Sequence, residues 1–179
     1  TYPIYPQSAP IRKKVNGPTL FNLLGPLLNP IQVQAKLIGA FNQEIAFTLA
    51  KTCNLLAQND VIVSAKDKDG YLDEASPFAK TFLYFCKDKM IYPFELEQIE
   101  EFSESRTSLF SDGVTVAKDL LSLKNSAATD FSKKMIAYNL ALLLILNEFN
   151  SAINDDLNNL LKKKQKNIRQ YYNIILSNF

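Results

Sequence analysis

The sequence predicts an α/β fold in which a mostly parallel sheet is wrapped by helices. Short runs of β-branched and aromatic residues occupy the first half of the chain, and helical spacing of apolar residues dominates from Glu95 onward. The order strand, helix, strand, hairpin, helices is typical of an α/β layer. With 179 residues, 47% of them apolar, the chain is long enough to bury a core as one domain or part of one.

The first 30 residues are rich in proline, which breaks them into short pieces. We expect a short helix over 9–15, because a proline is tolerated in its first turn. The turn Asn16-Gly17-Pro18 ends it. A second helix over 20–24 would follow Thr19 as its N-cap, and Gly25-Pro26 would interrupt it.

The middle of the chain alternates between strand and helix signals. A β-branched run after Asp60 is typical of a buried parallel strand. The expected elements are a strand over 34–41, a helix over 43–58, a strand over 60–64, a charged loop over 66–70, and a hairpin of 81–85 with 89–92 that turns at Lys87-Asp88.

The last third is expected to be helical, over 114–121, 130–150 and 154–178. Its longest apolar run, 140–146, falls well short of the roughly 20 residues that a membrane span needs. We therefore expect a buried core helix there, and no membrane partner. The N-terminus lacks the basic and apolar regions of a signal peptide.

Composition excludes several kinds of chemistry. The chain has no histidine, so it cannot itself form a Ser-His-Asp triad, a Cys-His pair or a His-ligated zinc site. Cys53 and Cys86 are too few for a thiolate metal site, and we expect free buried thiols in a reducing compartment. A net charge of +2 does not favour nucleic acid. The five glycines form no phosphate-binding motif.

Asp73-Glu74 is the best candidate site, since two adjacent carboxylates beyond a strand can hold Mg²⁺. The alternative is a solvated acidic loop that also contains Asp67 and Asp69. Arg12 could clamp a carboxylate through two hydrogen bonds, or could be a surface residue beside Lys13 and Lys14.

Two further features have plain structural explanations. The basic stretch Lys162–Lys166 is typical of a solvated helix face, because no aromatic residues are interleaved with it. Asn139, inside the apolar helix, is either a hydrogen-bonded amide or a site residue. Buried amides usually find backbone partners, which favours the first reading.

Several segments resemble one known family. They are Ala-Pro-Ile-Arg-Lys at 9–13, Thr-Leu-Phe-Asn-Leu-Leu-Gly-Pro-Leu-Leu-Asn-Pro at 19–30, Leu-Ile-Gly-Ala-Phe at 37–41 and Leu-Asp-Glu-Ala-Ser at 72–76. Asp112-Gly113 and Asn139 are weaker matches. The family is the anthranilate phosphoribosyltransferases, and the resemblance becomes faint after residue 150.

The resemblance implies a phosphoribosyl transfer in tryptophan biosynthesis, in which the amine of anthranilate displaces pyrophosphate from phosphoribosyl pyrophosphate with Mg²⁺. It implies that Arg12 grips the anthranilate carboxylate and that Pro26 lines the anthranilate pocket. It also implies that Asp73 and Glu74 coordinate Mg²⁺ near the pyrophosphate. Such catalysis is chiefly positioning and charge stabilisation, so no catalytic side chain within this chain is expected.

The chain also departs from the family pattern. Tyr2 replaces a histidine, Pro18 replaces a second arginine, and Tyr71 replaces a glycine. The family's glycine-rich Gly-Thr-Gly-Gly-Asp loop, its His-Gly-Asn-Arg segment and its N-terminal helices are absent from the sequence. Those elements carry most contacts to phosphoribosyl pyrophosphate in the family.

Two explanations remain open. The chain could be the C-terminal part of a longer or two-chain enzyme, which the missing initiator Met favours, or a diverged paralogue that binds a ligand or nucleic acid without catalysis. We expect the first, with the isolated chain inactive.

In that reading, residues 1–30 form a helical hinge segment toward a missing small helical domain. Residues 31–179 form the C-terminal part of a nucleoside phosphorylase/phosphoribosyltransferase-like α/β domain. The expected partners are anthranilate, phosphoribosyl pyrophosphate, the N-terminal part of the same protein and a second copy in a homodimer, in the cytoplasm.

Overall fold

The structure is a computed structural model that describes Lys14, residues 20–28, Val33 and residues 36–101, 113–122, 124–151 and 157–179. The chain divides into two compact units, Thr1–Gln32 and Val33–Phe179. Helix α2 (Leu20–Leu27) belongs to the first unit, and the helix expected over 9–15 lies outside the described residues.

Helix α2 contains Pro26 rather than ending before Gly25-Pro26, so the interruption expected there is wrong. A proline lacks the backbone N–H that would bond four residues back. Because Pro26 stands in the last turn of an eight-residue helix, it removes one such bond and the helix continues to Leu27.

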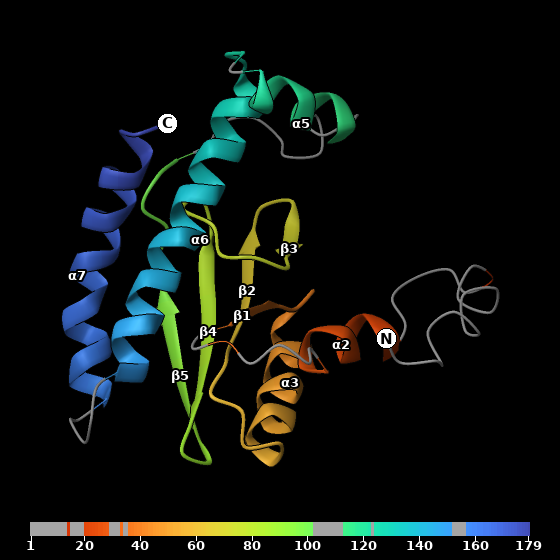
Figure 1. Cartoon of the computed structure of the whole chain (residues 1–179), viewed down its shortest axis with the longest axis vertical. Helices are drawn as coiled ribbons and strands as arrows, with labels where there is room; N and C mark the ends of the chain where they lie inside the picture. Colours follow the sequence, from red (N-terminus) through yellow and green to blue (C-terminus); the bar gives the residue numbers. More distant parts are fainter. Residues whose placement is uncertain are drawn as a thin grey trace. The chain divides into compact units, whose positions relative to one another are not determined.

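The second unit is built from five strands and four helices among its described residues (Figure 1). In chain order they are β1 (Leu37–Gly39), α3 (Gln43–Leu55), β2 (Val61–Asp67), β3 (Gly70–Leu72), β4 (Lys80–Lys87), β5 (Met90–Leu96), α5 (Gly113–Leu121), α6 (Ala127–Ser151) and α7 (Leu157–Leu176). The three helices predicted for the last third are confirmed, with no end shifted by more than three residues.

The α/β class is confirmed, but the described sheet is mixed rather than mostly parallel. Its order is β1-β2-β4-β5, with β3 also paired to β2. Only β1 and β2 are parallel, whereas the other three pairings are antiparallel. The β-branched run of β2 suggested parallel pairing because it is buried on both faces. The burial of β2 comes instead from helices on both faces of the sheet, and it does not depend on the direction of its neighbour β4, which runs antiparallel.

Two tight turns account for two of the three antiparallel pairings, β2–β3 and β4–β5. The segment 66–70, expected to be a charged loop, forms the β2–β3 hairpin, in which the Asp69 N–H donates to Asp67 Oδ1 at 2.9 Å. The β4–β5 turn lies at Asp88-Lys89, one residue later than expected. Both of these residues have positive φ, 51° and 62°, as a two-residue turn that matches the strand twist requires.

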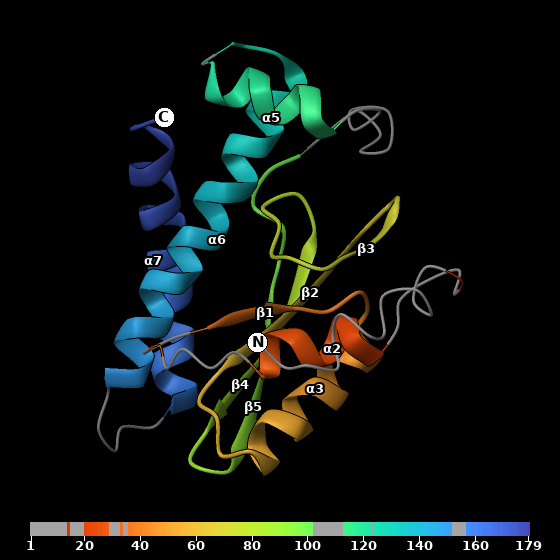
Figure 2. The same ribbon diagram turned by 45° about the vertical axis from the view of Figure 1, so that its right-hand side comes forward.

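Helices cover both faces of the sheet (Figure 2). Helices α6 and α7 pack on one face, where Val61, Val63, Leu83 and Phe85 join their side chains in the main core. The alternate residues of β2 and β4 point to the other face, which α3 covers. Phe47 of α3, for example, lies with its ring centroid 5.5 Å from that of Tyr84.

Helix α6 is the central helix of the unit. Tyr138 is 1% exposed and meets Tyr172 of α7 edge to face, with the ring centroids 5.8 Å apart. Burial raises the pKa of Tyr138 above its usual value. Among the described residues, no helix combines the length and apolarity that a membrane span requires.

A polar cluster is buried between α3 and β4. Cys53 and Cys86 are free and buried, as predicted, and the neighbouring Cys86 thiol together with burial raises the pKa of the Cys53 thiol. Cys53 Sγ also lies 3.8 Å from Asp60 Oδ2, and the Cys86 N–H donates to the Asp60 carbonyl at 2.8 Å. The Asp60 carboxylate is paired with Lys36 Nζ at 3.0 Å, so the charge is balanced inside the protein.

We predict that Asp60→Asn lowers the free energy of unfolding by about 2–3 kcal/mol, because it leaves Lys36 unpaired while still partly buried. The control is Asp119→Asn, which breaks an exposed ion pair to Lys124 and should cost less than about 1 kcal/mol. Urea unfolding of both variants measures the difference. Equal costs would contradict a structural role for the buried pair.

Candidate functional site

The candidate site lies where two short strands meet on one edge of β2. Strand β1 pairs with residues 61–63 in parallel, and β3 pairs with residues 65–67 antiparallel. The last residues of β1 and β3 therefore approach each other beside Ser64. The chain leaves β3 at Leu72, so Asp73 emerges directly against the end of β1.

Gly39 makes this approach possible. A Cβ built on Gly39 would lie 1.7 Å from the carbonyl oxygen of Asp73, a separation that no side chain could tolerate. Glycine in a strand often marks a site where another part of the backbone approaches closely. The Asp73 carbonyl therefore packs directly against the backbone of Gly39, and this contact fixes the position of the residues that follow Asp73.

The other end of the loop is held by α6. Asn139 accepts a hydrogen bond from the Ala75 N–H at 3.1 Å and donates to the Ala75 carbonyl at 2.8 Å. Its amide also donates to the Met135 carbonyl at 2.9 Å, which fixes the side chain on its own helix. Of the two readings of Asn139, the hydrogen-bonded amide is confirmed.

The residues after Ala75 are anchored as well. Ser76 is 1% exposed, and its N–H donates to the hydroxyl of Thr81 at 3.2 Å. The ring of Phe78 stacks on that of Phe131 from α6, with the centroids 4.9 Å apart. The loop therefore runs between fixed points on β1, β4 and α6.

Lys134 of α6 lies next to this stack, with Nζ 5.9 Å from the centre of the Phe78 ring. Its ammonium is paired with Glu100 at 3.0 Å and with Asp130 at 3.2 Å. Burial lowers the pKa of Lys134, but the hydrogen bonds to these carboxylates outweigh that effect and leave the pKa above its usual value. This cation is already neutralised by its neighbours.

Asp73 and Glu74 are the exposed residues of the anchored loop. Their carboxylates can offer oxygen ligands of the kind that Mg²⁺ prefers, and Mg²⁺ usually takes only one or two of these from a protein. Asp67 and Asp69 belong to the tip of the β2–β3 hairpin, about 10 Å away along three strand residues. Accordingly, the described residues contain no group of three or more potential metal ligands.

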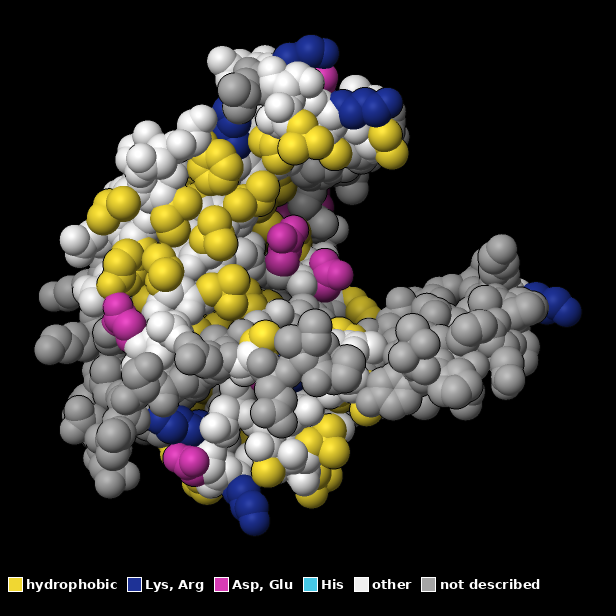
Figure 3. Space-filling model, viewed as in Figure 1, with side chains coloured by type: hydrophobic (Ala, Val, Ile, Leu, Met, Phe, Trp, Pro, Cys, Tyr) yellow, Lys and Arg dark blue, Asp and Glu magenta, His cyan; other side chains and the backbone are white. Residues whose placement is uncertain are grey.

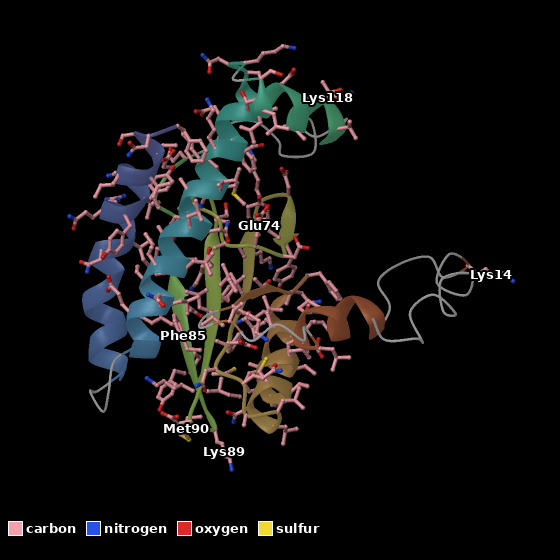
Figure 4. The ribbon with its side chains drawn as sticks, viewed as in Figure 1. Lys14, Glu74, Phe85, Lys89, Met90 and Lys118 are labelled. Atoms are coloured by element: carbon pink, nitrogen blue, oxygen red, sulfur yellow. The ribbon has the colours of Figure 1, made fainter. Side chains whose placement is uncertain are left out.

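Glu74, which is labelled in Figure 4, also lines a groove. It is an open groove with a volume of about 320 Å³ between α5 and α6. Among the described residues, its lining is apolar except for Glu74 and Ser132, and the apolar part comes from Val116, Ala117, Leu120, Phe131, Met135 and Ile136. Sequence analysis missed this groove, because it arises from the packing of two helices.

Asp73 and Glu74, the predicted metal pair, are adjacent and exposed residues of the anchored loop. Arg12 lies outside the described residues, and Pro26 belongs to the first compact unit. The stretch Lys162–Lys166 lies in α7, and its side chains are outside the described part. Sequence analysis missed Gly39 as a positioning residue, although a glycine inside the strand predicted over 34–41 was an available signal.

We predict that Gly39→Ala lowers the free energy of unfolding by about 3 kcal/mol or displaces the loop, because the added methyl overlaps the Asp73 carbonyl. Gly70→Ala is the comparison. A Cβ at Gly70 meets nothing within 4 Å, so Gly70→Ala should lower the free energy of unfolding only through the strain of its positive φ, by about 1–2 kcal/mol. Thermal unfolding ranks the two. A Gly39→Ala protein as stable as Gly70→Ala would refute the close approach.

Comparison with known proteins adds family information to this geometry. Residues 2–166 match the model of the glycosyl transferase family, a/b domain. Anthranilate phosphoribosyltransferases of Bacillus cereus (strain B4264) and Bacillus mycoides (strain KBAB4) are each 31% identical over 96 residues. Each alignment covers 54% of this chain but only 27% of the bacterial protein.

Two solved structures of the anthranilate phosphoribosyltransferase from Saccharomyces cerevisiae share the fold. One is a complex with 4-fluoroanthranilate, with a TM-score of 0.58, and the other a complex with PRPP and Mg, with a TM-score of 0.60. Both are 24% identical to this chain and are matched over 96% of it. The chain spans 49% of the yeast protein, about half its length. Because the family model covers most of the sequence, the chain belongs to the glycosyl transferase family with an a/b domain, and within it this domain is anthranilate phosphoribosyltransferase-like.

Proposed function

We propose that this chain is the C-terminal part of an anthranilate phosphoribosyltransferase, which transfers phosphoribosyl from phosphoribosyl pyrophosphate to the amine of anthranilate in tryptophan biosynthesis. One observation carries the proposal: Asp73 and Glu74 stand on a loop whose backbone is fixed by Gly39 and Asn139. The family match and the yeast protein solved with PRPP and Mg support the substrate class.

Asp73 and Glu74 would hold Mg²⁺, and their chemistry fits it. Two neighbouring carboxylates supply oxygen ligands and leave the remaining positions to water and substrate oxygens. The ion, when bound, would neutralise negative charge on the departing pyrophosphate. The contribution of this chain is to keep the two carboxylates in place, so that little ordering is needed when the ion and substrate bind.

Other parts of the site are proposed from the family resemblance. Arg12 would hold the anthranilate carboxylate and Pro26 would line the anthranilate pocket. The glycine-rich segment that contacts phosphoribosyl pyrophosphate would come from the N-terminal part of the same protein. Residues 1–30 would form the hinge toward a helical domain. The assembled protein would act as a cytoplasmic homodimer.

We predict that Mn²⁺, used as a spectroscopic substitute for Mg²⁺, binds this chain directly in a buffer free of phosphate and other chelators. Asp73→Asn and Glu74→Gln should each weaken binding about tenfold or more, because each removes a charged ligand. Asp69→Asn is the matched control, since Asp69 lies at the hairpin tip, and it should leave binding unchanged. Electron paramagnetic resonance measures free Mn²⁺. Equal binding by all three variants would remove the metal assignment.

We predict that the purified chain alone does not consume anthranilate, because the glycine-rich segment is absent from it. Loss of anthranilate fluorescence at about 1 s⁻¹ or faster by the chain alone would contradict this. An intact-mass spectrum reports first whether a second polypeptide accompanies the 20.2 kDa species.

The competing reading is a non-catalytic paralogue that binds nucleic acid. Arg12→Ala separates the two, because it should weaken anthranilate binding in the assembled enzyme and leave nucleic-acid affinity nearly unchanged. Salt-dependent binding of DNA by the wild-type chain would favour the paralogue instead.

A further inference from the structure

Helix α6 carries an apolar face that the described residues leave exposed. Between Met135 and Leu146, the exposed residues of the helix are Ile136, Leu140 and Leu144, which are 39%, 42% and 47% exposed. They are spaced four residues apart, so they form one row, which is about 12 Å long. We call these three residues the α6 apolar face. Figure 3 shows apolar side chains gathered over this helix.

The outward face of a surface helix is normally polar, and the neighbouring helix α7 follows that rule. Within 167–176, three of the four exposed residues of α7 are polar: Arg169, Gln170 and Asn173. Helix α6 differs, because Tyr138 and Leu142 pack in the main core while the opposite face is apolar as well. A helix that is apolar all round is typical of a buried position. A contiguous apolar patch marks an interaction surface, unlike scattered single residues.

The α6 apolar face adjoins the loop that carries the proposed metal pair. Ile136 belongs to this face and also lines the groove that Glu74 lines. Glu74 lies beside α6 in Figure 4. Asn139, the residue before Leu140, holds the N–H and the carbonyl of Ala75 in the same loop. Any segment that covers the face is therefore brought next to the two carboxylates.

From these observations we propose that the α6 apolar face is the docking surface for the N-terminal part of the same protein. This inference rests on the proposed function, which takes the glycine-rich segment from that part. The lengths of the relatives support it, because 96% of this chain matches the yeast protein while the match covers only 49% of that protein. The docking segment would be a helix with apolar residues three and four positions apart, which packs along a row such as this one.

A second copy of this chain is the alternative occupant. Two copies could pair antiparallel along α6, with Leu140 against its equivalent and Ile136 against Leu144. Such a dimer would bring to the loop only segments of the same sequence, which contains no glycine-rich phosphate-binding motif. The proposed reaction needs such a segment beside the loop, so the N-terminal part is the occupant that we assign.

Photo-crosslinking identifies the occupant directly. The photoreactive amino acid p-benzoylphenylalanine is introduced at Leu140 in the protein made from its complete gene. After irradiation, mass spectrometry should find the Leu140 peptide linked to a peptide from outside residues 1–179. The sequence of that peptide should align with the half of the yeast protein that this chain does not match. The same label at Leu55, which is 87% exposed in α3, is the control and should give no such link.

Leu140→Glu provides an independent measurement, because a carboxylate is costly in a buried apolar contact and harmless on an exposed helix face. The variant should lower the melting temperature of the complete protein by about 5 °C or more, and should leave that of the 179-residue chain within about 2 °C. Leu55→Glu is the matched control, and should change neither protein by more than about 2 °C.

Four crosslinking results overturn the proposal. They are a link from Leu140 to residues 33–179 of a second copy, which a mixture of ¹⁴N and ¹⁵N chains reveals, a link to residues 1–32, a link to a protein unlike the yeast enzyme, and no link at all. Equal loss of melting temperature in both proteins on Leu140→Glu would also contradict it.

Neither readout uses a metal or phosphoribosyl pyrophosphate. If the link forms as expected and Mn²⁺ does not bind, the metal assignment fails while the docking surface stands. If Mn²⁺ binds and Leu140 gives no link, the docking surface fails alone.

Discussion

The account depends on one close backbone contact, that of the Asp73 carbonyl with Gly39. It exists because β1 and β3 occupy successive stretches of the same edge of β2, one parallel and one antiparallel. A β3 strand one residue longer would run into β1, and a side chain at Gly39 would push the loop away. The position of the two carboxylates therefore follows from strand pairing that lies outside the loop itself.

Helix α6 completes the arrangement and links the candidate site to the core. One face of the helix packs on the sheet through Tyr138 and Leu142, while the Asn139 side chain bonds both the N–H and the carbonyl of Ala75. The start of the same helix lines the groove. Any shift of α6 would move the loop and the groove together, so the stability of the core and the geometry of the site are coupled.

Local patterns predicted the fold class, because apolar spacing reports directly on helix faces and buried strands. They also pointed to Asp73 and Glu74 and to the buried state of Cys53 and Cys86. Local patterns could not predict strand direction, because the apolar run of β2 is the same whether its neighbour runs parallel or antiparallel. The pairing of Gly39 with Asp73 joins residues far apart in sequence, and no local pattern encodes it.

The central claim is that the chain's own contacts fix the loop before any metal or substrate binds. Hydrogen–deuterium exchange of the metal-free chain, read at the Ala75 and Ser76 amides, tests it most directly. Both amides have internal acceptors, Asn139 Oδ1 and Thr81 Oγ1, so the account predicts exchange as slow as that of β4 amides. Exchange at the rate of an unstructured peptide, slowed only by added Mg²⁺, would show that the metal orders the loop and would contradict the claim.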